Sequence, residues 1–188
     1  MTAIVGLVFE GSIYLGADSS ACDMENMMHV SRLEPKVFRN GQYLMGVAGQ
    51  TRCAQVMHYV FNPPCVPSGV RGNARVIEFM VREFVPALRD CLEEQGVTSG
   101  EVTDPFPGNV IIGVRDCLLE LEPDFQVSVN IEPWAAAGTG SAYCLGALFA
   151  QKDTLLDPVT IIGNALDAAA TYSMTVRPPF TVERLPND

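Results

Sequence analysis

Positively charged side chains are scarce in this chain. Its 188 residues include 12 Lys and Arg against 22 Asp and Glu, which gives a formal net charge of −10. A protein that binds nucleic acid needs clustered basic side chains to neutralise phosphates, and an anionic membrane surface attracts the same side chains. The charge balance therefore argues against both, and we expect neither nucleic acid nor a membrane as a partner.

Long apolar runs and metal-binding patterns are also lacking. The apolar stretch near the N-terminus ends at Glu10 and has no basic segment before it, so we expect no signal peptide and no membrane span. The six cysteines are scattered, and only His29 and His58 carry imidazoles, so no zinc or redox motif is formed. These features predict reduced thiols, a cytoplasmic location and no metal.

What the chain does contain is an alternation of strand and helix patterns over one domain, residues 1–188. With 48 % hydrophobic and 18 % charged residues, its composition is that of a globular protein. The order of strands, two helices, strands, two helices and a strand predicts a layered α+β domain with antiparallel sheets between helix layers. The expected strands are a hairpin within 2–16, then 36–38, 43–48, 109–114, 118–121, 126–131 and 181–184. The expected helices are 51–59, 73–95 with a kink at Pro86, 141–151, and one that starts at 157–158. Residues 23–31 are interpreted as a loop or weakly formed strand, and Asn40-Gly41 as a hairpin turn.

The hairpin within residues 2–16 places Thr2 at its tip, directly before a core strand. Removal of Met1, which aminopeptidases perform when a small residue follows, would leave Thr2 with a free α-amine beside its hydroxyl. An α-amine has a pKa of about 7.7–8.0 and can act as a base near neutral pH. Thr2 could then supply nucleophile and base together, although many ordinary chains also begin with Met-Thr.

Asp18 and Lys36 are the next candidate functional residues. Asp18 ends the second strand of the hairpin, and Lys36 begins the third strand. The chain has only two lysines, Lys36 and Lys152, so a lysine between apolar neighbours suggests a specific need for an ammonium group. Asp18 could pair with Lys36 and hold it near Thr2, or the two could form a purely structural ion pair.

Backbone N–H groups for an oxyanion are expected where the strand 43–48 breaks at Gly49. Gly49 could equally be a plain strand terminator. The run from Gly138 to Ser141 precedes a helix, but it matches neither a P-loop nor a dinucleotide fingerprint, and we expect no cofactor. Thr139 and Ser141 could assist proton transfer or simply cap that helix.

These motifs together resemble the proteasome β-type subunits and the bacterial HslV peptidase. The start Thr-Ala-Ile-Val-Gly-Leu-Val-Phe with the later Gly-Ala-Asp18-Ser-Ser-Ala resembles the start of the mature subunits. Lys36-Val37 and the segment 46–49 resemble their catalytic Lys and oxyanion-hole Gly, and the segment 137–143 resembles their Gly-Ser-Gly motif. The order and spacing of these matches extend over nearly the whole chain.

The resemblance implies an N-terminal nucleophile hydrolase fold, a four-layer αββα sandwich. It implies threonine-type peptide hydrolysis inside a homo-oligomeric ring, with unfolded polypeptides as substrates and often an AAA+ unfoldase as partner. The pocket for the substrate's P1 side chain would be small and would favour moderately sized apolar residues. Its expected lining residues are Ala21, Cys22, Val47 and Thr51.

The resemblance also assigns roles to the candidate residues. Thr2 would be the nucleophile and its own amine the base. Lys36 would tune that amine, Asp18 would hold Lys36, and the Gly49 N–H would stabilise the oxyanion. Two further hydroxyl residues would hydrogen-bond near the amine: Thr139 and Ser141.

Some positions depart from the family pattern. Proteasome subunits carry a longer propeptide than Met1, as well as an assisting Asp and Ser near the end of the late helix. In this chain Ser173 and Val176 align with those two residues, to within one or two positions. Thr139 replaces the usual Ser, and the Pro-rich segment 177–179 is atypical.

Two other functions stay open at this point. One is a non-catalytic, proteasome-like ring or interaction protein, which would follow if Met1 is retained. The other is an amidase of the same fold that acts on a small molecule.

Overall fold

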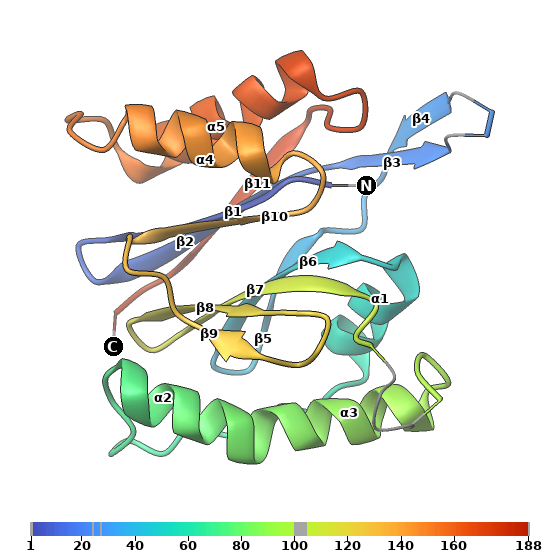
Figure 1. The fold of residues 1–188 in the computed structure, drawn as a ribbon, viewed down its shortest axis with the longest axis vertical. Helices are drawn as coiled ribbons and strands as arrows, with labels where there is room; N and C mark the ends of the chain where they lie inside the picture. The colour runs from blue at the N-terminus through green and yellow to red at the C-terminus, as the bar shows by residue number, and fades with distance from the viewer. Residues whose placement is uncertain (1, 24, 27, 100–104, 188) are drawn as a thin grey trace.

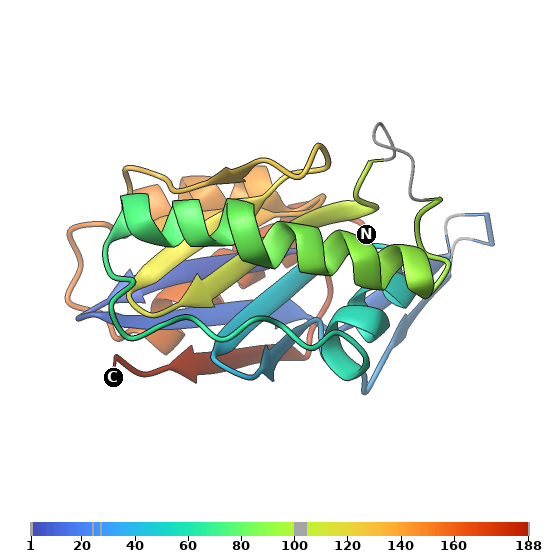
Figure 2. The same cartoon turned by 90° about the horizontal axis from the view of Figure 1, so that it is seen from below.

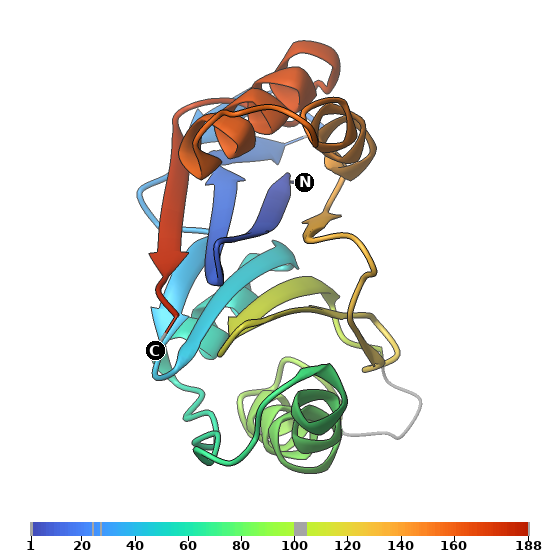
Figure 3. The same ribbon diagram turned by 90° about the vertical axis from the view of Figure 1, so that its left-hand side faces the viewer.

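Two antiparallel β-sheets lie face to face between two layers of helices in the computed structural model (Figure 1). The structure describes residues 2–23, 25–26, 28–99 and 105–187. Within these ranges, no helix has the length and apolar character needed to cross a bilayer. The order helix, sheet, sheet, helix is visible from the side in Figure 3 and confirms the predicted αββα sandwich.

The first sheet has the strand order β10-β1-β2-β11 and is centred on the N-terminal hairpin. Its strands are β1 (Ile4–Phe9), β2 (Ser12–Asp18), β10 (Trp134–Ala137) and β11 (Phe180–Leu185). The turn between β1 and β2 has positive φ angles at Glu10 (49°) and Gly11 (75°), as a type I′ hairpin turn requires. The hairpin prediction is therefore confirmed, and β1 lies in the interior of the sheet, between β10 and β2.

The second sheet has the strand order β5-β6-β7-β8-β9. Its strands are β5 (Val37–Asn40), β6 (Tyr43–Gly49), β7 (Gly108–Val114), β8 (Cys117–Leu121) and β9 (Val127–Ser128). A separate two-stranded ribbon, β3 (Ser20–Asp23) with β4 (Met28–Ser31), continues from β2 past the N-terminus (Figure 1).

Each sheet is covered on its outer face by helices. The first is covered by α4 (Ser141–Ala150) and α5 (Pro158–Tyr172). The second is covered by α1 (Thr51–Tyr59) and by one long helical rod, which is made of α2 (Asn73–Phe79), η1 (Met80–Phe84) and α3 (Val85–Glu94) (Figures 1 and 2). The predicted cap of α5 is present, because the Asp157 carboxylate accepts hydrogen bonds from the N–H groups of Val159 and Thr160.

The sequence predicted a kink of the long helical rod at Pro86, and the structure has a π turn just before this residue. Proline has no N–H, and its ring crowds the carbonyl four residues earlier. The π segment η1 widens the helix just before the proline, and the Val85 N–H bonds the Met80 carbonyl five residues back. The rod therefore continues past Pro86 instead of ending there.

Three apolar clusters hold the four layers together. One lies between the two sheets, and the other two lie between each sheet and its helices. The sheets approach closely near the start of β1, since a Cβ added to Gly46 would lie 2.5 Å from the Ile4 side chain. This contact fixes the beginning of β1 against β6 of the opposite sheet.

Several sequence predictions need correction. Residues 135–137 form strand β10 and pair with β1, whereas the sequence indicated only a run of small residues. Alanine has low β-propensity, and these residues form a strand because they pair with β1. Strand β9 covers two residues, not 126–131. In the segment 23–31, interpreted as a loop or weakly formed strand, Asp23 ends β3 and Met28–Ser31 form β4, which pairs with β3.

The β5–β6 turn is shifted by one residue from its prediction. Asn40 is the last residue of β5, and Gly41-Gln42 makes the turn, with Gly41 at φ 58°. The Asn40 side-chain amide instead donates to the carbonyls of Met57 and Phe61 at the end of α1. Met1 and parts of the predicted loops lie outside the described residues.

Candidate active site

Thr2 is buried at the entrance of β1 and held on both sides. Its backbone nitrogen lies 3.3 Å from the Thr139 hydroxyl, and its carbonyl oxygen accepts from the Gly140 N–H at 3.3 Å. On the other side, the next residue, Ala3, donates its N–H to an Asp18 carboxylate oxygen at 3.0 Å. Only 5 % of Thr2 is exposed. The backbone nitrogen that would become an α-amine therefore has a fixed place.

Asp18 is a buried hydrogen-bond acceptor that joins several segments at this end of the sandwich. One carboxylate oxygen accepts from the Ala3 N–H and from Lys36 Nζ at 2.8 Å. The other accepts from the Ser20 N–H at 3.1 Å and from the Ser20 hydroxyl at 2.6 Å. Four donors around a side chain that is 1 % exposed compensate for the burial of its charge.

Lys36 lies just before β5, with its side chain directed to Asp18. Its carbonyl accepts from the Val47 N–H at 3.0 Å, which extends the β5–β6 pairing by one residue. Burial lowers the pKa of the Lys36 ammonium below its usual value, and the attraction of Asp18 offsets part of that effect. The predicted Asp18–Lys36 pair is thus present in the structure, with side-chain exposures of 18 % for Lys36 and 0 % for Asp18.

The turn before α4 wraps around Thr2 because it contains a glycine. Gly138 has φ 90°, and a Cβ there would lie 2.2 Å from the Thr2 carbonyl oxygen. Thr139 follows and brings its hydroxyl to the Thr2 nitrogen. Ser141 is the first residue of α4 and donates its N–H to the Gly138 carbonyl. Among the described residues, the Ser141 hydroxyl has no hydrogen-bond partner, so no such bond joins it to Thr2.

A chain of hydroxyls continues from Thr139 into the segment after α5. The Thr139 hydroxyl lies 2.8 Å from the Thr175 hydroxyl, which in turn lies 3.0 Å from the Ser173 hydroxyl. The Thr175 carbonyl oxygen lies 2.7 Å from the Ser20 hydroxyl, whose single hydrogen is shared between this carbonyl and Asp18. Thr175 therefore connects the surroundings of Thr139 to those of Asp18.

The sequence interpretation did not identify Thr175 or Ser20. The alignment by resemblance drew attention to Ser173 and Val176, and Val176 is fully buried in the apolar cluster under α4 and α5. Thr175 lies between them, inside the stated margin of a residue or two. The alternation of polar and apolar residues after α5 is the available signal, because Thr175 makes hydrogen bonds whereas Val176 packs in the apolar cluster.

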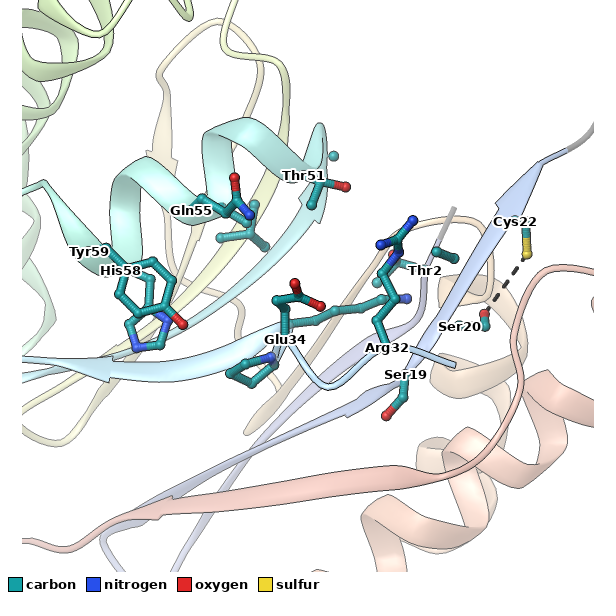
Figure 4. A pocket seen from close by; sticks show the side chains of 16 residues that line it. Thr2, Ser19, Ser20, Cys22, Arg32, Glu34, Thr51, Gln55, His58 and Tyr59 are labelled. Atoms are coloured by element: carbon teal, nitrogen blue, oxygen red, sulfur yellow. Dashed lines mark hydrogen bonds between the residues drawn. The ribbon is translucent and has the colours of Figure 1, made fainter. Parts of the chain in front are cut away.

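A cavity of about 150 Å³ opens beside Thr2, and Figure 4 shows its lining side chains. Lys36 and Gly49 reach the same cavity from the second sheet. The four residues predicted for the P1 pocket also line it: Ala21, Cys22, Val47 and Thr51. The lining does not include Asp18, Thr139 or Ser141. Any effect of these residues on Thr2 must therefore come from outside the cavity.

The remaining wall of the cavity is more polar than the sequence indicated. Gln55, His58 and Tyr59 face it from α1, opposite the β3 residues, and Arg32 and Glu34 contribute from the segment before β5 (Figure 4). Burial lowers the pKa of His58, which stacks on Tyr59 with ring centroids 4.0 Å apart. Within the described part of the chain, no group of three or more His, Cys, Asp or Glu side chains could hold a metal ion.

Gly49 ends β6 where β6 and β7 come unusually close. A Cβ at Gly49 would lie 2.2 Å from the Pro107 carbonyl oxygen and 2.7 Å from the Gly108 Cα. The next residue, Gln50, donates its N–H to Pro107 at 3.0 Å and begins the turn into α1. Only glycine fits at position 49, and its backbone lies at the rim of the Thr2 cavity.

Comparison with known proteins gives matches in structure only. No protein-family model matches the sequence. A search of curated proteins gives no match either. Among solved structures, the BPH protein of Thiobacillus denitrificans is similar with a TM-score of 0.79 and 18 % identity, over 99 % of this chain and 98 % of that chain. The same protein in complex with epoxomicin gives a TM-score of 0.80 at 18 % identity, over 99 % of each chain.

A eukaryotic HslV from Trypanosoma brucei is also similar, with a TM-score of 0.67 and 17 % identity over 97 % of this chain and 98 % of that chain. Identities this low show a shared fold. They confirm, for the fold, the resemblance to HslV-like proteins inferred from the sequence. The chain thus has the N-terminal nucleophile hydrolase fold, with Thr2 at the entrance of its first strand.

Proposed function

We propose that this chain is a threonine-type endopeptidase whose nucleophile is Thr2, exposed as the N-terminal residue by cleavage of the Met1–Thr2 bond. The observation that carries the proposal is the meeting of Thr2, Lys36 and Gly49 at one cavity, with the Asp18–Lys36 pair behind it. The shared fold with HslV and the Thiobacillus protein supports it.

In the proposed reaction, the Thr2 hydroxyl attacks the carbonyl carbon of a peptide bond and gives its proton to the Thr2 α-amine. The resulting tetrahedral oxyanion accepts a hydrogen bond from the Gly49 N–H. The C–N bond then breaks, and the protonated amine returns its proton to the leaving amino group. Water hydrolyses the ester on Thr2 by the same route and restores the hydroxyl.

Lys36 and the hydroxyl chain prepare the amine for this role. A buried ammonium near the α-amine disfavours a second positive charge, so the amine stays neutral and basic near neutral pH. Thr139 lies within hydrogen-bond distance of the Thr2 nitrogen and orients it. Thr175, through its contact with Thr139, would assist the amine in place of the carboxylate and serine that the resemblance to proteasome subunits implies.

The substrate and assembly proposals rest on the cavity and on the outer helices. Ala21, Cys22, Val47 and Thr51 leave room for a moderately sized apolar P1 side chain of an unfolded polypeptide. Helix α4 and the C-terminal end of α5 expose large apolar side chains, among them Phe149 at 60 % and Tyr172 at 73 %. This supports burial of that face in a homo-oligomeric ring. We propose an AAA+ unfoldase as the partner of that ring and the cytoplasm as its location.

The proposal treats residues 1–188 as one proteasome-subunit-like domain. Both sheets contribute to the apolar cluster between them, which supports a single folding unit.

The test combines the mass of the purified chain with labelling by epoxomicin, an epoxyketone that offers carbon electrophiles to both the hydroxyl and the amine of an N-terminal threonine. We expect a mass without Met1, one bound epoxomicin, and hydrolysis of unstructured peptides. Thr2→Ala should assemble normally but lose labelling and hydrolysis, while Thr171→Ala, on the exposed side of α5, should retain both. A mass that includes Met1, or full hydrolysis by Thr2→Ala, would refute the proposal.

A further inference from the structure

A second hollow, of about 200 Å³, lies at the end of the sandwich opposite Thr2. It is formed by the β5–β6 turn, the segment before α2, the β7–β8 turn and the residues after β11. These segments gather around the C-terminal end of the chain in Figures 1 and 2, away from the N-terminus. Three arginines line it: Arg39, Arg71 and Arg115.

Arg115 is held in place by the backbone at an energetic cost. It has φ 57° in the β7–β8 turn, a left-handed conformation that is unfavourable for a residue with a side chain. One guanidinium nitrogen donates to the Val66 carbonyl at 2.7 Å. Its Nε is buried, and within the described residues it has no hydrogen-bond partner. This buried donor has hydrogen-bonding capacity left for a group that enters the hollow.

The other two arginines add charge that no described residue neutralises through an ion pair. Arg39 donates to the Arg184 carbonyl, and the Arg71 side chain has no hydrogen bond or ion pair within the described residues. Among the described lining residues the one acidic side chain is that of Asp116, so these residues together carry a formal excess of positive charge. In a chain with a net charge of −10, three neighbouring arginines without an ion-pair partner in the described part of the structure are a local exception.

We propose that this hollow binds a small oxyanion, either free phosphate or the phosphoryl group of a small metabolite. Guanidinium groups present forked N–H donors that match the oxygens of phosphate, and charge-assisted bonds of this kind are the strong ones. A hollow of about 200 Å³ has room for a phosphate with a short substituent. The site is independent of the Thr2 chemistry, since it lies at the other end of the molecule.

The test is calorimetric titration of the purified chain at low ionic strength with inorganic phosphate and, in a separate arm, with ribose 5-phosphate. Saturable binding in either arm supports the site, and the tighter arm identifies free phosphate or a phosphoryl ester as the natural form. Arg71→Gln, an exposed position, should weaken binding about tenfold or more. Arg115→Gln should do the same. Arg52→Gln on α1 removes the same charge at the Thr2 end and should leave the affinity unchanged.

Two results would overturn the proposal. One is the absence of saturable binding of both probes to the unaltered chain at low salt. The other is equal affinity of Arg71→Gln and Arg52→Gln, which would mean that the anion senses only net charge. If Arg115→Gln does not fold, Arg71→Gln still decides, because its side chain is exposed and unpaired within the described residues.

Discussion

Replacing Asp18 by asparagine keeps the shape of the side chain and removes its charge. The native carboxylate accepts from the Ala3 N–H, from the Ser20 N–H and hydroxyl, and from Lys36 Nζ at 2.8 Å. An amide has one oxygen, and its NH₂ group would face donors on the other side. At least one buried donor pair therefore loses its acceptor.

The expected loss of stability follows from the burial of the ion pair. Removing one partner of a buried pair costs about 3–5 kcal/mol because the other charge remains uncompensated. That is a large part of the about 5–15 kcal/mol that a domain of this kind has in total. Lys36 can relieve some of the cost by losing its proton, since burial already lowers its pKa.

The pH dependence gives a sharper signature. Without Asp18, only burial acts strongly on Lys36, and its pKa in the folded chain falls further below the unfolded value of 10.5. Between those two pKa values the unfolded chain holds more protons than the folded chain, so stability rises with pH. The deficit of Asp18→Asn should therefore shrink as the pH is raised toward 10.5.

Urea denaturation at fixed protein concentration measures these quantities for Asp18→Asn, Lys36→Met and the double variant. The double variant should be more stable than Asp18→Asn alone, because no unpaired charge remains. Asp157→Asn is the matched control: that carboxylate is an exposed helix cap, asparagine caps equally well, and the loss should stay below about 0.5 kcal/mol. A loss for Asp18→Asn no larger than that control, or a deficit that grows with pH, would refute the reasoning.

Three further predictions concern activity and folding. Thr175→Val removes a buried hydroxyl from the hydrogen-bonded chain that leads to the Thr2 amine, so kcat for peptide hydrolysis should fall about 3- to 10-fold. The control Thr171→Val should keep the native kcat, and equal kcat values for the two variants would contradict the role of Thr175. Gly138→Ala places a Cβ 2.2 Å from the Thr2 carbonyl oxygen, at a residue whose φ is 90°, and should lower the free energy of unfolding by at least about 2 kcal/mol. An unchanged Tm in thermal unfolding would contradict the packing described. Lys36→Met removes a positive charge near the Thr2 amine, so the pKa of this amine and the midpoint of the kcat/KM pH profile should both rise, by about one unit. An unchanged midpoint would show that Lys36 does not act on the amine.

The elements that the sequence predicts well are those whose local signals agree with their packing. The β1–β2 hairpin has a turn pair at Glu10-Gly11 between β-forming runs, and α5 has Asp157 and Pro158 at its start. The β5–β6 turn was predicted one residue early because Asn40-Gly41 is a common turn pair. Tertiary contacts of the Asn40 amide with the end of α1 decide otherwise.

Strand β10 shows what local patterns miss. Its three alanines carry little preference for a strand, and they become one only because β1 offers unpaired backbone groups along that edge. Thr175 shows the same limit for the site. It is an ordinary threonine in the sequence, and its contact with Thr139 depends on how the segment after α5 folds back toward the turn before α4.

The pairing of β1 with a strand from the far half of the chain has a consequence for biosynthesis. Thr139, which contacts the Thr2 nitrogen, is 137 residues away in sequence, and Thr175 is 155 residues from Ser20. A ribosome adds about 5–20 residues per second, so these partners emerge several seconds or more after Thr2. Until then the N-terminal segment of the nascent chain lacks its contacts with Thr139 and Thr175. If Thr2 acts as proposed, its surroundings would therefore be completed only late in synthesis, once both ends of the chain are present.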